Sequence, residues 1–218
     1  MDCSKYADIF KLNIPTDFGS DEYGNLTDDI REVIRQLHFD PCSHNYDFGA
    51  SKFVIFFDDN EVIKIPFNGY FCEAEDDETG ERYDDFLPFE IINDYCAEEE
   101  RIYDLAVEAG VEMFFAKTRY IGSTVSDTPL YASERVICNY TPHPSQKSID
   151  TLKDKYSGFQ YEVNRSWSAA AIEYYGEELF SKFVAFVEQN RISDLHNGNI
   201  GYRKDGAPVL LDYSGYED

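Results

Sequence analysis

The sequence predicts an α+β fold in two parts, with an antiparallel sheet in the first half and a mainly helical second half. Three observations support this. Residues 52–57 and 61–65 are rich in β-branched and aromatic side chains and flank the turn Asp58-Asp59-Asn60, a pattern typical of a β-hairpin. Residues 177–190 place apolar side chains on one helical face. The segment Thr141-Pro142-His143-Pro144 breaks the chain between the two halves.

The remaining elements follow in chain order. Residues 1–27 carry no clear period, and Thr27 can cap a helix over 28–37. Residues 73–85 contain eight acids and one Arg, and such dense like charge favours a mobile, solvent-facing loop. We further expect a helix over 89–109 that stops at Gly110, strands over 113–121 and 133–140, helices over 145–155 and 166–175, and short strands over 200–202 and 208–211.

These elements divide the chain into three segments. Residues 1–39 form an N-terminal segment with one helix, residues 40–140 form the sheet-containing part, and residues 141–218 form the helical part. The boundary at 140/141 rests on the Pro-rich break.

Composition limits the function. Hydrophobic residues make up 43% of the 218, enough to form a core, and 19 Lys and Arg against 43 Asp and Glu give a net charge of −24. A surface of this sign repels phosphate backbones and anionic membranes, so we expect no direct nucleic-acid binding and no membrane partner. A basic protein, or an anionic ligand masked by metal, suits it better.

The localisation expected is cytoplasmic. No run of apolar residues is long enough for a membrane helix, and the first residues have neither the basic nor the apolar region of a signal peptide. The cysteines also favour a reducing compartment, because they are scattered, odd in number and form no CxxC pair: Cys3, Cys42, Cys72, Cys96 and Cys138.

One stretch near the end combines the groups that phosphoryl transfer needs. Asp194 is followed after four intervening residues by Asn199, and Asp212 ends the apolar run Val209-Leu210-Leu211. Transfer to a hydroxyl requires one carboxylate that orients the attacking oxygen. It also requires an amide oxygen and a second carboxylate that hold magnesium against the nucleotide phosphates.

The segment Asp194-Leu195-His196-Asn197-Gly198-Asn199 resembles the catalytic loop of the protein-kinase-like superfamily. It is most similar to the small-molecule branch of aminoglycoside and choline kinases, whose loops contain D-L-H-x-x-N. The resemblance covers about residues 40–218. It implies a two-lobed kinase-like fold with an antiparallel-sheet N-lobe and a reduced, mainly helical C-lobe, and it implies ATP and Mg²⁺ as cofactors.

The resemblance also assigns roles to residues. Asp194 would be the catalytic base, Asn199 and Asp212 would bind the metal, and Lys64 would hold the nucleotide phosphates. Glu99 would position Lys64, with Glu98 as the close alternative. The remaining nucleotide contacts would come from the phosphate-covering loop, through Gly49 and Ser51, and from the hinge that holds adenine, through Cys138 and Tyr140.

The chain departs from the family in several places. The phosphate-covering loop contains one glycine, and the triplet Ile192-Ser193-Asp194 lacks the His and Arg of protein kinases. The chain ends at Asp218, which leaves no room for an activation segment, so we expect a C-terminally truncated C-lobe. His196 is expected to form a hydrogen bond that stabilises the loop.

Two functions fit these features. The first is an ATP- and magnesium-dependent phosphotransferase acting on a hydroxyl of a small molecule or a protein. The alternative is a catalytically weak, pseudokinase-like acidic module that binds or inhibits a basic partner protein. The retained Lys64, Asp194, Asn199 and Asp212 favour the first, and the extreme acidity favours the second.

Overall fold

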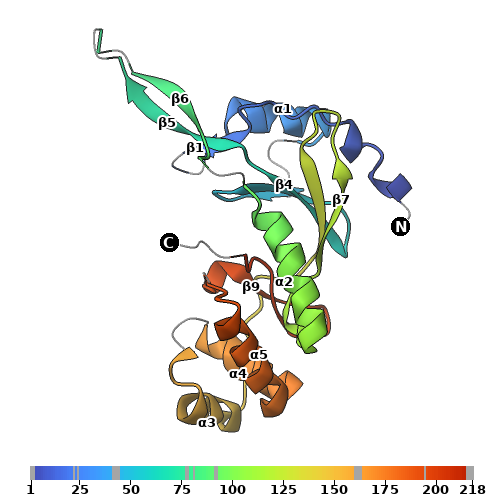
Figure 1. The fold of residues 1–218 in the computed structure, drawn as a ribbon, viewed down its shortest axis with the longest axis vertical. Coiled ribbons are helices and arrows are strands. Elements are labelled where there is room, and N and C mark those ends of the chain that lie inside the picture. Colours follow the sequence, from blue (N-terminus) through green and yellow to red (C-terminus); the bar gives the residue numbers. More distant parts are fainter. Residues whose placement is uncertain are drawn as a thin grey trace. The chain divides into compact units, whose positions relative to one another are not determined.

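The chain folds into two compact units, each with its own hydrophobic core. The structure is a computed structural model that describes residues 3–21, 23, 25–40, 45–76, 79–80, 82–90, 93–159, 164–193 and 195–214. Unit 1 comprises residues 1–97 and 119–133, and unit 2 comprises residues 98–118 and 134–218. Helices and strands occur in both (Figure 1), so the predicted α+β class is confirmed.

Unit 1 is built on a five-stranded sheet of order β2-β3-β4-β8-β7. Its strands are β2 (Tyr46–Phe48), β3 (Lys52–Phe56), β4 (Glu61–Pro66), β7 (Thr118–Ser123) and β8 (Pro129–Glu134). The β3–β4 hairpin confirms the pairing expected from the sequence, with Val54 opposite Lys64 and Lys52 opposite Pro66. β4 therefore occupies the middle of the sheet.

The N-terminal segment packs onto one face of this sheet. Helix α1 (Asp28–Gln36) begins at Thr27, whose hydroxyl accepts a hydrogen bond from the Ile30 amide, as expected of a cap. The short 3₁₀ turns η1 (Cys3–Tyr6) and η2 (Ile9–Lys11) precede it. Residues 1–39 belong to unit 1, and their apolar side chains form part of its core. The fully buried members include Tyr6, Phe18, Ile30, Val33, Phe53, Ile63 and Ile65.

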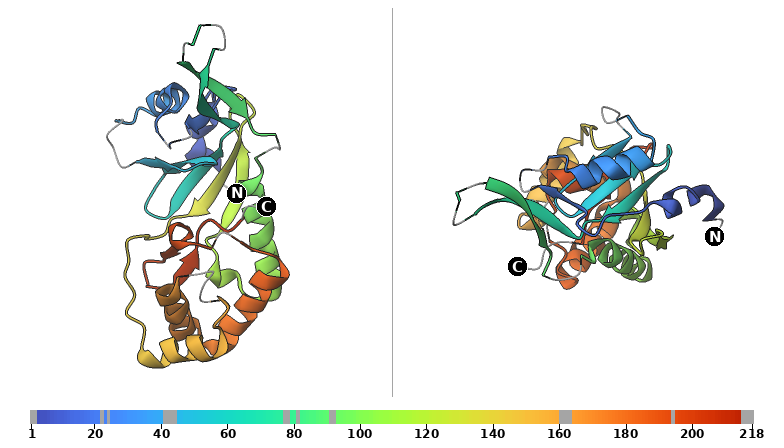
Figure 2. Two further views of the ribbon diagram at one scale, coloured as in Figure 1. Left: turned by 90° about the vertical axis from the view of Figure 1, so that its left-hand side faces the viewer. Right: turned by 90° about the horizontal axis from the view of Figure 1, so that it is seen from above.

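A second sheet in unit 1 contains strands β1 (Gly19–Asp21), β5 (Gly69–Glu75) and β6 (Arg82–Pro88), in the order β1-β5-β6. The loop predicted over 73–85 is therefore wrong in part: its described residues lie mainly in two antiparallel strands. Arg82 bonds Glu73 across the strands and reduces the like-charge repulsion that had suggested a loop. We call β5 and β6 together the acidic ribbon; it extends from the five-stranded sheet of its unit (Figures 1 and 2).

Unit 2 is mainly helical. It contains most of α2 (Tyr95–Ala109), together with η3 (Glu112–Phe114), α3 (Gln146–Lys155), α4 (Arg165–Tyr175) and α5 (Glu177–Gln189). Phe183 of α5 lies at the centre of its core, stacked on Phe114 with ring centroids 4.3 Å apart and in contact with Trp167. The last two strands, β9 (Ile200–Tyr202) and β10 (Pro208–Leu210), form an antiparallel hairpin.

Three predicted boundaries are wrong. Helix α2 begins at Tyr95 instead of 89, because Asn93 is held in the preceding segment by donating to the carbonyls of Ser51 and Phe67. The strand predicted over 113–121 begins at Thr118, since Phe114 and Phe115 are buried in the core of unit 2. The strand predicted over 133–140 spans Pro129–Glu134 instead.

Two further observations concern the whole described chain. No helix among the described residues combines the length and the apolar character needed to cross a membrane. Of the cysteines whose side chains the structure describes, Cys72, Cys96 and Cys138, none forms a disulfide.

Candidate functional site

The β9–β10 hairpin of unit 2 brings Asn199 and Asp212 to the same end. Ile200 is paired with Leu210, and the ladder continues outward because the Leu211 amide donates to the Asn199 carbonyl at 3.1 Å. Asn199 is therefore directly opposite Leu211, and Asp212 is the next residue along the chain. Asn199 is buried and Asp212 is half-buried. Two residues separated by a turn and two strands thus become neighbours at the open end of one hairpin.

The backbone after Asp212 is anchored by Tyr213. This side chain is fully buried, and its hydroxyl donates to the Ala116 carbonyl at 2.8 Å. Burial raises the pKa of Tyr213 well above its ordinary value, so the hydroxyl stays protonated and remains a donor. The position of Asp212 is consequently fixed on one side by the Asn199–Leu211 bond and on the other by Tyr213.

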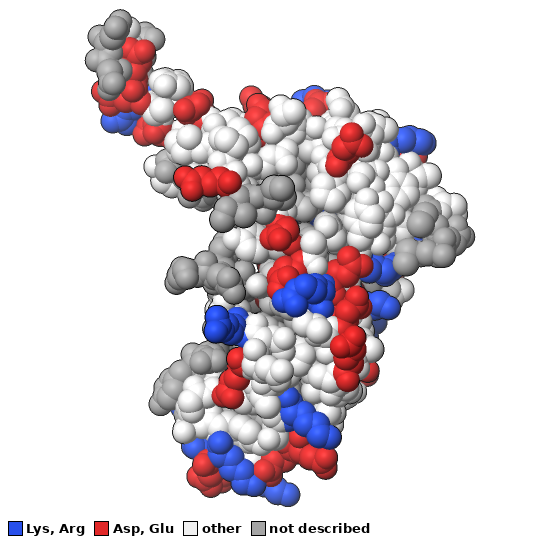
Figure 3. All heavy atoms as spheres, in the orientation of Figure 1, with Lys and Arg blue, Asp and Glu red and all other residues white. Residues whose placement is uncertain are grey.

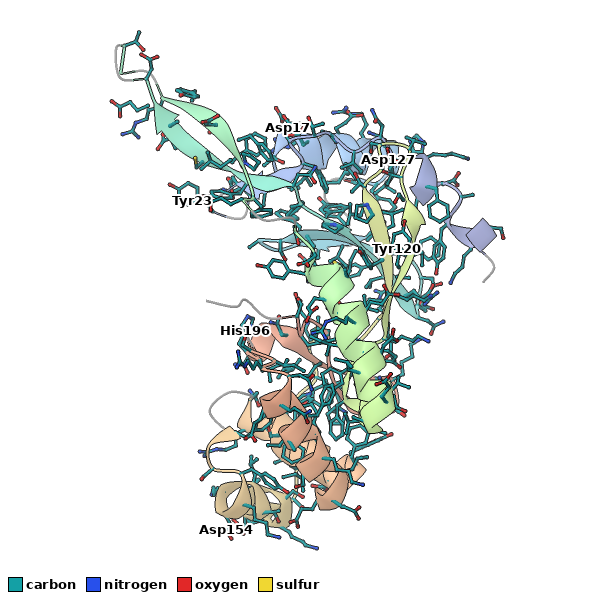
Figure 4. The ribbon with its side chains drawn as sticks, in the orientation of Figure 1. Asp17, Tyr23, Tyr120, Asp127, Asp154 and His196 are labelled. Atoms are coloured by element: carbon teal, nitrogen blue, oxygen red, sulfur yellow. The ribbon has the colours of Figure 1, made fainter. Side chains whose placement is uncertain are left out.

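The loop before Asn199 is ordered by His196, which Figure 4 labels. His196 caps the 3₁₀ turn η5 (Asn197–Asn199) because its Nδ1 accepts a hydrogen bond from the Gly198 amide at 2.9 Å. The predicted stabilising hydrogen bond of His196 is confirmed. An imidazole that accepts at Nδ1 carries its proton at Nε2.

Helix α4 supports the same loop from a second direction. Its N-cap, Asn164, accepts from the amides of Ser166 and Trp167 and donates to the Asn197 side chain at 2.7 Å. Trp167 is fully buried and donates through Nε1 to the Gly201 carbonyl at 3.3 Å. The sequence did not single out Asn164 as part of the loop's support, although an Asn directly before a helix is a recognisable cap.

Arg203 holds the hairpin to the rest of unit 2. Its guanidinium bonds both carboxylate oxygens of Glu134, at 2.7 and 2.9 Å, and it also donates to the carbonyls of Met113 and Phe115. The Tyr175 hydroxyl lies within hydrogen-bond distance of the Met113 and Pro208 carbonyls, at 3.0 and 2.9 Å, and burial raises the pKa of Tyr175 to about 12. Sequence reasoning missed Arg203, because nothing local distinguishes it from an exposed Arg.

The donor set at the hairpin end suits a hard cation in part. An amide oxygen and a carboxylate oxygen are ligands that Mg²⁺ accepts, and Mg²⁺ in nucleotide sites commonly takes one or two protein ligands plus phosphates and water. In the part of the chain that the structure describes, no three His, Cys, Asp or Glu side chains gather as a metal site. The predicted catalytic base, Asp194, lies outside the described residues.

The predicted lysine lies on the central strand of unit 1. Ile63 and Ile65 point into the core of this unit, so Lys64 between them projects to the opposite face of the sheet. Lys64 is nonetheless only 4% exposed, which is rare for a lysine without a specific role. The strand placement expected of Lys64 is thus observed.

The predicted phosphate-covering loop is the turn between β2 and β3. Gly49 is exposed, its amide donates to the Lys52 carbonyl at 3.1 Å, and no atom stands within 4 Å of where a Cβ would lie. Ser51 is half-buried, and its carbonyl accepts from Phe67 and Asn93. This turn thus lies next to the β3–β4 hairpin that carries Lys64.

Burial separates the acids of helix α2. Glu99 is fully buried and accepts a hydrogen bond from the Thr118 hydroxyl at 2.8 Å. Glu98 instead pairs on the surface with Arg101, one turn along the helix. The predicted helix phase, with Glu99 directed inward, is therefore observed. Its pairing with Lys64 stays a prediction.

The predicted hinge leaves the sheet of unit 1 after Glu134. Ile137 exchanges backbone hydrogen bonds with Tyr202, and a Cβ on Gly201 would lie 2.7 Å from the Val136 side chain, so β9 needs glycine at 201 for this approach. Cys138 is exposed, and the exposed Tyr140 packs its ring on Tyr202 with centroids 4.6 Å apart.

The candidate residues fall into two groups. Gly49, Ser51 and Lys64 belong to unit 1, whereas Glu99, Cys138, Tyr140, Asn199 and Asp212 belong to unit 2. Of these residues, the hairpin of unit 2 brings Asn199 and Asp212 to one end. That the two groups converge on one cleft stays a prediction.

Comparison with protein-family models, with curated proteins and with solved structures gave no match.

Proposed function

We propose that this chain is an ATP- and magnesium-dependent phosphotransferase that acts on a hydroxyl of a small molecule or a protein. The observation that supports it best is the Leu211–Asn199 hydrogen bond at 3.1 Å, which holds Asn199 beside Asp212. A chance D-x-x-x-x-N spacing would not require the second carboxylate to fold back next to the Asn. An amide oxygen and a carboxylate on adjacent backbone are a suitable pair for one divalent cation.

Each predicted site residue would have a separate role. Asn199 and Asp212 would hold Mg²⁺, which supplies the positive charge that neutralises the nucleotide phosphates. Lys64 would bind those phosphates and Glu99 would orient Lys64. Asp194 would accept the proton of the attacking hydroxyl. Gly49, Ser51, Cys138 and Tyr140 would contact the remainder of the nucleotide.

Lys64 and Glu99 are both buried, as their proposed roles require. Lys64 is only 4% exposed on the central strand, and of the three acids at 98–100 Glu99 alone is fully buried. The net charge of −24 repels ATP that carries no bound metal, because its phosphates are also negatively charged. ATP should therefore bind only with a divalent cation present.

Thermal denaturation with ATP and MgCl₂, together or separately, tests the proposal. A ligand at about 100 times its Kd stabilises the folded state by about 2.7 kcal/mol, so a competent site gives a concentration-dependent rise in Tm. We expect the rise with both present and little with ATP alone. The absence of any Mg-dependent shift and of any turnover would refute the phosphotransferase proposal.

Two variants separate binding from chemistry. Asp212→Asn should weaken Mg-ATP binding, because it removes the charged ligand. Asp194→Asn should leave binding nearly unchanged and remove turnover. Asp154→Asn on helix α3 is the matched control, since Asp154 is exposed and the same exchange there should change neither quantity. Calorimetry for binding and an ATP-hydrolysis assay for turnover provide the two measurements.

The second candidate function is an acidic binding module for a basic partner. The observation favouring it is the acidic ribbon, whose described carboxylates are exposed rather than used in the core. A protein that binds Mg-ATP without turnover in the wild-type form would fit this candidate better than the first.

A further inference from the structure

The two faces of the acidic ribbon differ in chemistry. In an antiparallel pair, directly opposed residues point to the same face. One face therefore carries Tyr70 with Leu87, Cys72 with Asp85, and Ala74 with Tyr83. The other carries Phe71 with Phe86, Glu73 with Asp84, and Glu75 with Arg82. The first face is largely apolar, and the second is acidic over its outer part.

The apolar face is exposed to solvent. Tyr70, Tyr83 and Leu87 are 37%, 51% and 38% exposed, although all three are large apolar side chains. An apolar strip of this kind, bordered by charge, is typical of an interaction surface. On the other face, Phe71 and Phe86 pack on each other near the base with centroids 5.1 Å apart and are half-buried, so its acidic end is the more exposed part.

The ribbon also offers backbone groups. β6 is the edge strand of the β1-β5-β6 sheet and six of its seven residues are exposed. In an edge strand every second peptide group points away from its neighbour and is open to pairing with an added strand. Pro88 at the base of β6 cannot donate, which limits such pairing to the outer part of the strand.

The carboxylates of the acidic ribbon favour an added strand that carries positive charge. Arg82 is occupied by Glu73, whereas Asp84 and Asp85 form no hydrogen bond or ion pair with any residue that the structure describes. Figure 3 shows acidic side chains gathered toward the outer end of the ribbon. Pairing two copies of β6 would bring these carboxylates together and is disfavoured. A strand with lysine or arginine on the same face gains attraction instead.

We propose that the β6 edge of the acidic ribbon binds an extended basic segment of a partner protein by strand addition. The segment would alternate apolar and basic side chains. Its apolar side chains would extend the Tyr70–Leu87–Tyr83 face. Its basic ones would lie beside Asp84 of β6, on the face that also carries Glu73 and Glu75 of β5. This docking surface lies wholly within unit 1 and holds whether or not the chain binds a nucleotide.

The probe is a fluorescent peptide of alternating valine and lysine, about as long as β6. Fluorescence anisotropy should show saturable binding, and mass-spectrometric hydrogen exchange should show slower exchange of residues 82–88 with the peptide present. Two control peptides separate the contributions. Replacing lysine by glutamate should abolish binding through charge, and N-methylation of alternate amides should abolish it through the backbone.

Matched variants locate the site. Glu75→Lys with Asp84→Lys should weaken binding by about tenfold or more, since attraction on one face becomes repulsion. Asp104→Lys with Glu108→Lys makes the same change in net charge at two exposed positions of α2 and should leave affinity within about twofold. All four positions are exposed, so both variants should fold, which circular dichroism checks.

Several results would overturn the proposal. Equal losses in the two charge-reversal variants would show attraction to the whole protein rather than to the ribbon. Undiminished binding of the N-methylated peptide would exclude strand addition. Concentration-dependent protection of residues 82–88 without peptide would make a second copy of this chain the occupant. Lack of binding at millimolar peptide would also reject the site.

Discussion

Replacing Arg203 by Met should destabilise unit 2 by about 2–3 kcal/mol. The guanidinium makes two charge-assisted bonds to Glu134 and two to main-chain carbonyls. Four such bonds at about 1.5–3 kcal/mol each would sum to as much as the whole stability of a domain. This sum is too large, because removing the guanidinium also removes the free energy spent on desolvating it.

The solvent exposure of the Arg203–Glu134 ion pair determines how much stability its removal costs. Breaking a fully buried ion pair costs about 3–5 kcal/mol. The side chains of Arg203 and Glu134 are 23% and 29% exposed, so water can solvate part of the carboxylate that is left behind. Methionine keeps most of the apolar stem, which limits the loss of packing. An intermediate value of about 2–3 kcal/mol follows.

Urea denaturation followed by tryptophan fluorescence measures the effect. Trp167 is the single tryptophan, and it is fully buried in the core of unit 2 beside the hairpin that carries Arg203. Arg165→Met, the same exchange at an exposed position of α4, should change stability by less than about 0.5 kcal/mol. Adding Glu134→Gln to Arg203→Met should cost less than the two single changes together.

A stability of Arg203→Met within about 0.5 kcal/mol of wild type would refute the reasoning. Strict additivity with Glu134→Gln would also refute it, because it would mean that the two side chains contribute independently.

Two further predictions concern single side chains. Glu61 accepts hydrogen bonds from Tyr6 and Arg119 and pairs with Lys5; burial alone would raise its pKa, but these bonds outweigh burial and lower it. Glu61→Gln should therefore cost about 1–2 kcal/mol at neutral pH. Thermal denaturation across pH should show this deficit shrink as the pH falls below the ordinary glutamate pKa, and vanish only below the lowered pKa of the folded state, where the wild-type carboxylate takes up its proton. Phe183→Ala should cost about 3–5 kcal/mol in urea denaturation, because its ring fills the centre of the unit 2 core; a loss below about 1 kcal/mol would mean that the core closes around the gap.

The elements that sequence predicted well are those with a strong local period and a cap. Helix α1 has Thr27 at its start, and α5 carries a continuous apolar face, so both were placed within a residue or two. The β3–β4 hairpin has two runs of β-formers around a polar turn. In these segments local propensity and tertiary packing favour the same structure, so the sequence alone is enough to predict them.

The acidic ribbon shows why other elements could not be predicted. Counting charge over 73–85 treats every acid as a neighbour of every other, but a strand sends alternate side chains to opposite faces. Asp85 is thereby directed away from Glu73, Glu75 and Asp84, and Arg82 is placed among these three, across from Glu75 and next to Glu73. Strand pairing of this kind depends on a partner segment that no local window contains.

Arg203 and Glu99 represent opposite cases for site prediction. Arg203 is 69 residues from its partner Glu134, so no spacing rule could have connected them. The inward direction of Glu99 followed from the helical offsets of Ile102 and Ala106, both of which are buried. Periodicity within one helix is thus predictable from sequence, whereas a bond between distant segments is not.

The burial of Glu99 bears on whether Glu99 or Glu98 is the partner of Lys64. A carboxylate inside a protein costs several kcal/mol unless hydrogen bonds and an opposite charge compensate for the lost water. Thr118 provides one such hydrogen bond. Lys64, only 4% exposed, is a buried cation that bears the same cost of lost hydration. Glu98, by contrast, lies on the surface beside Arg101 and bears much less of that cost. Burial therefore favours Glu99 over Glu98 as the acid that the resemblance pairs with Lys64, and the pairing itself stays a prediction.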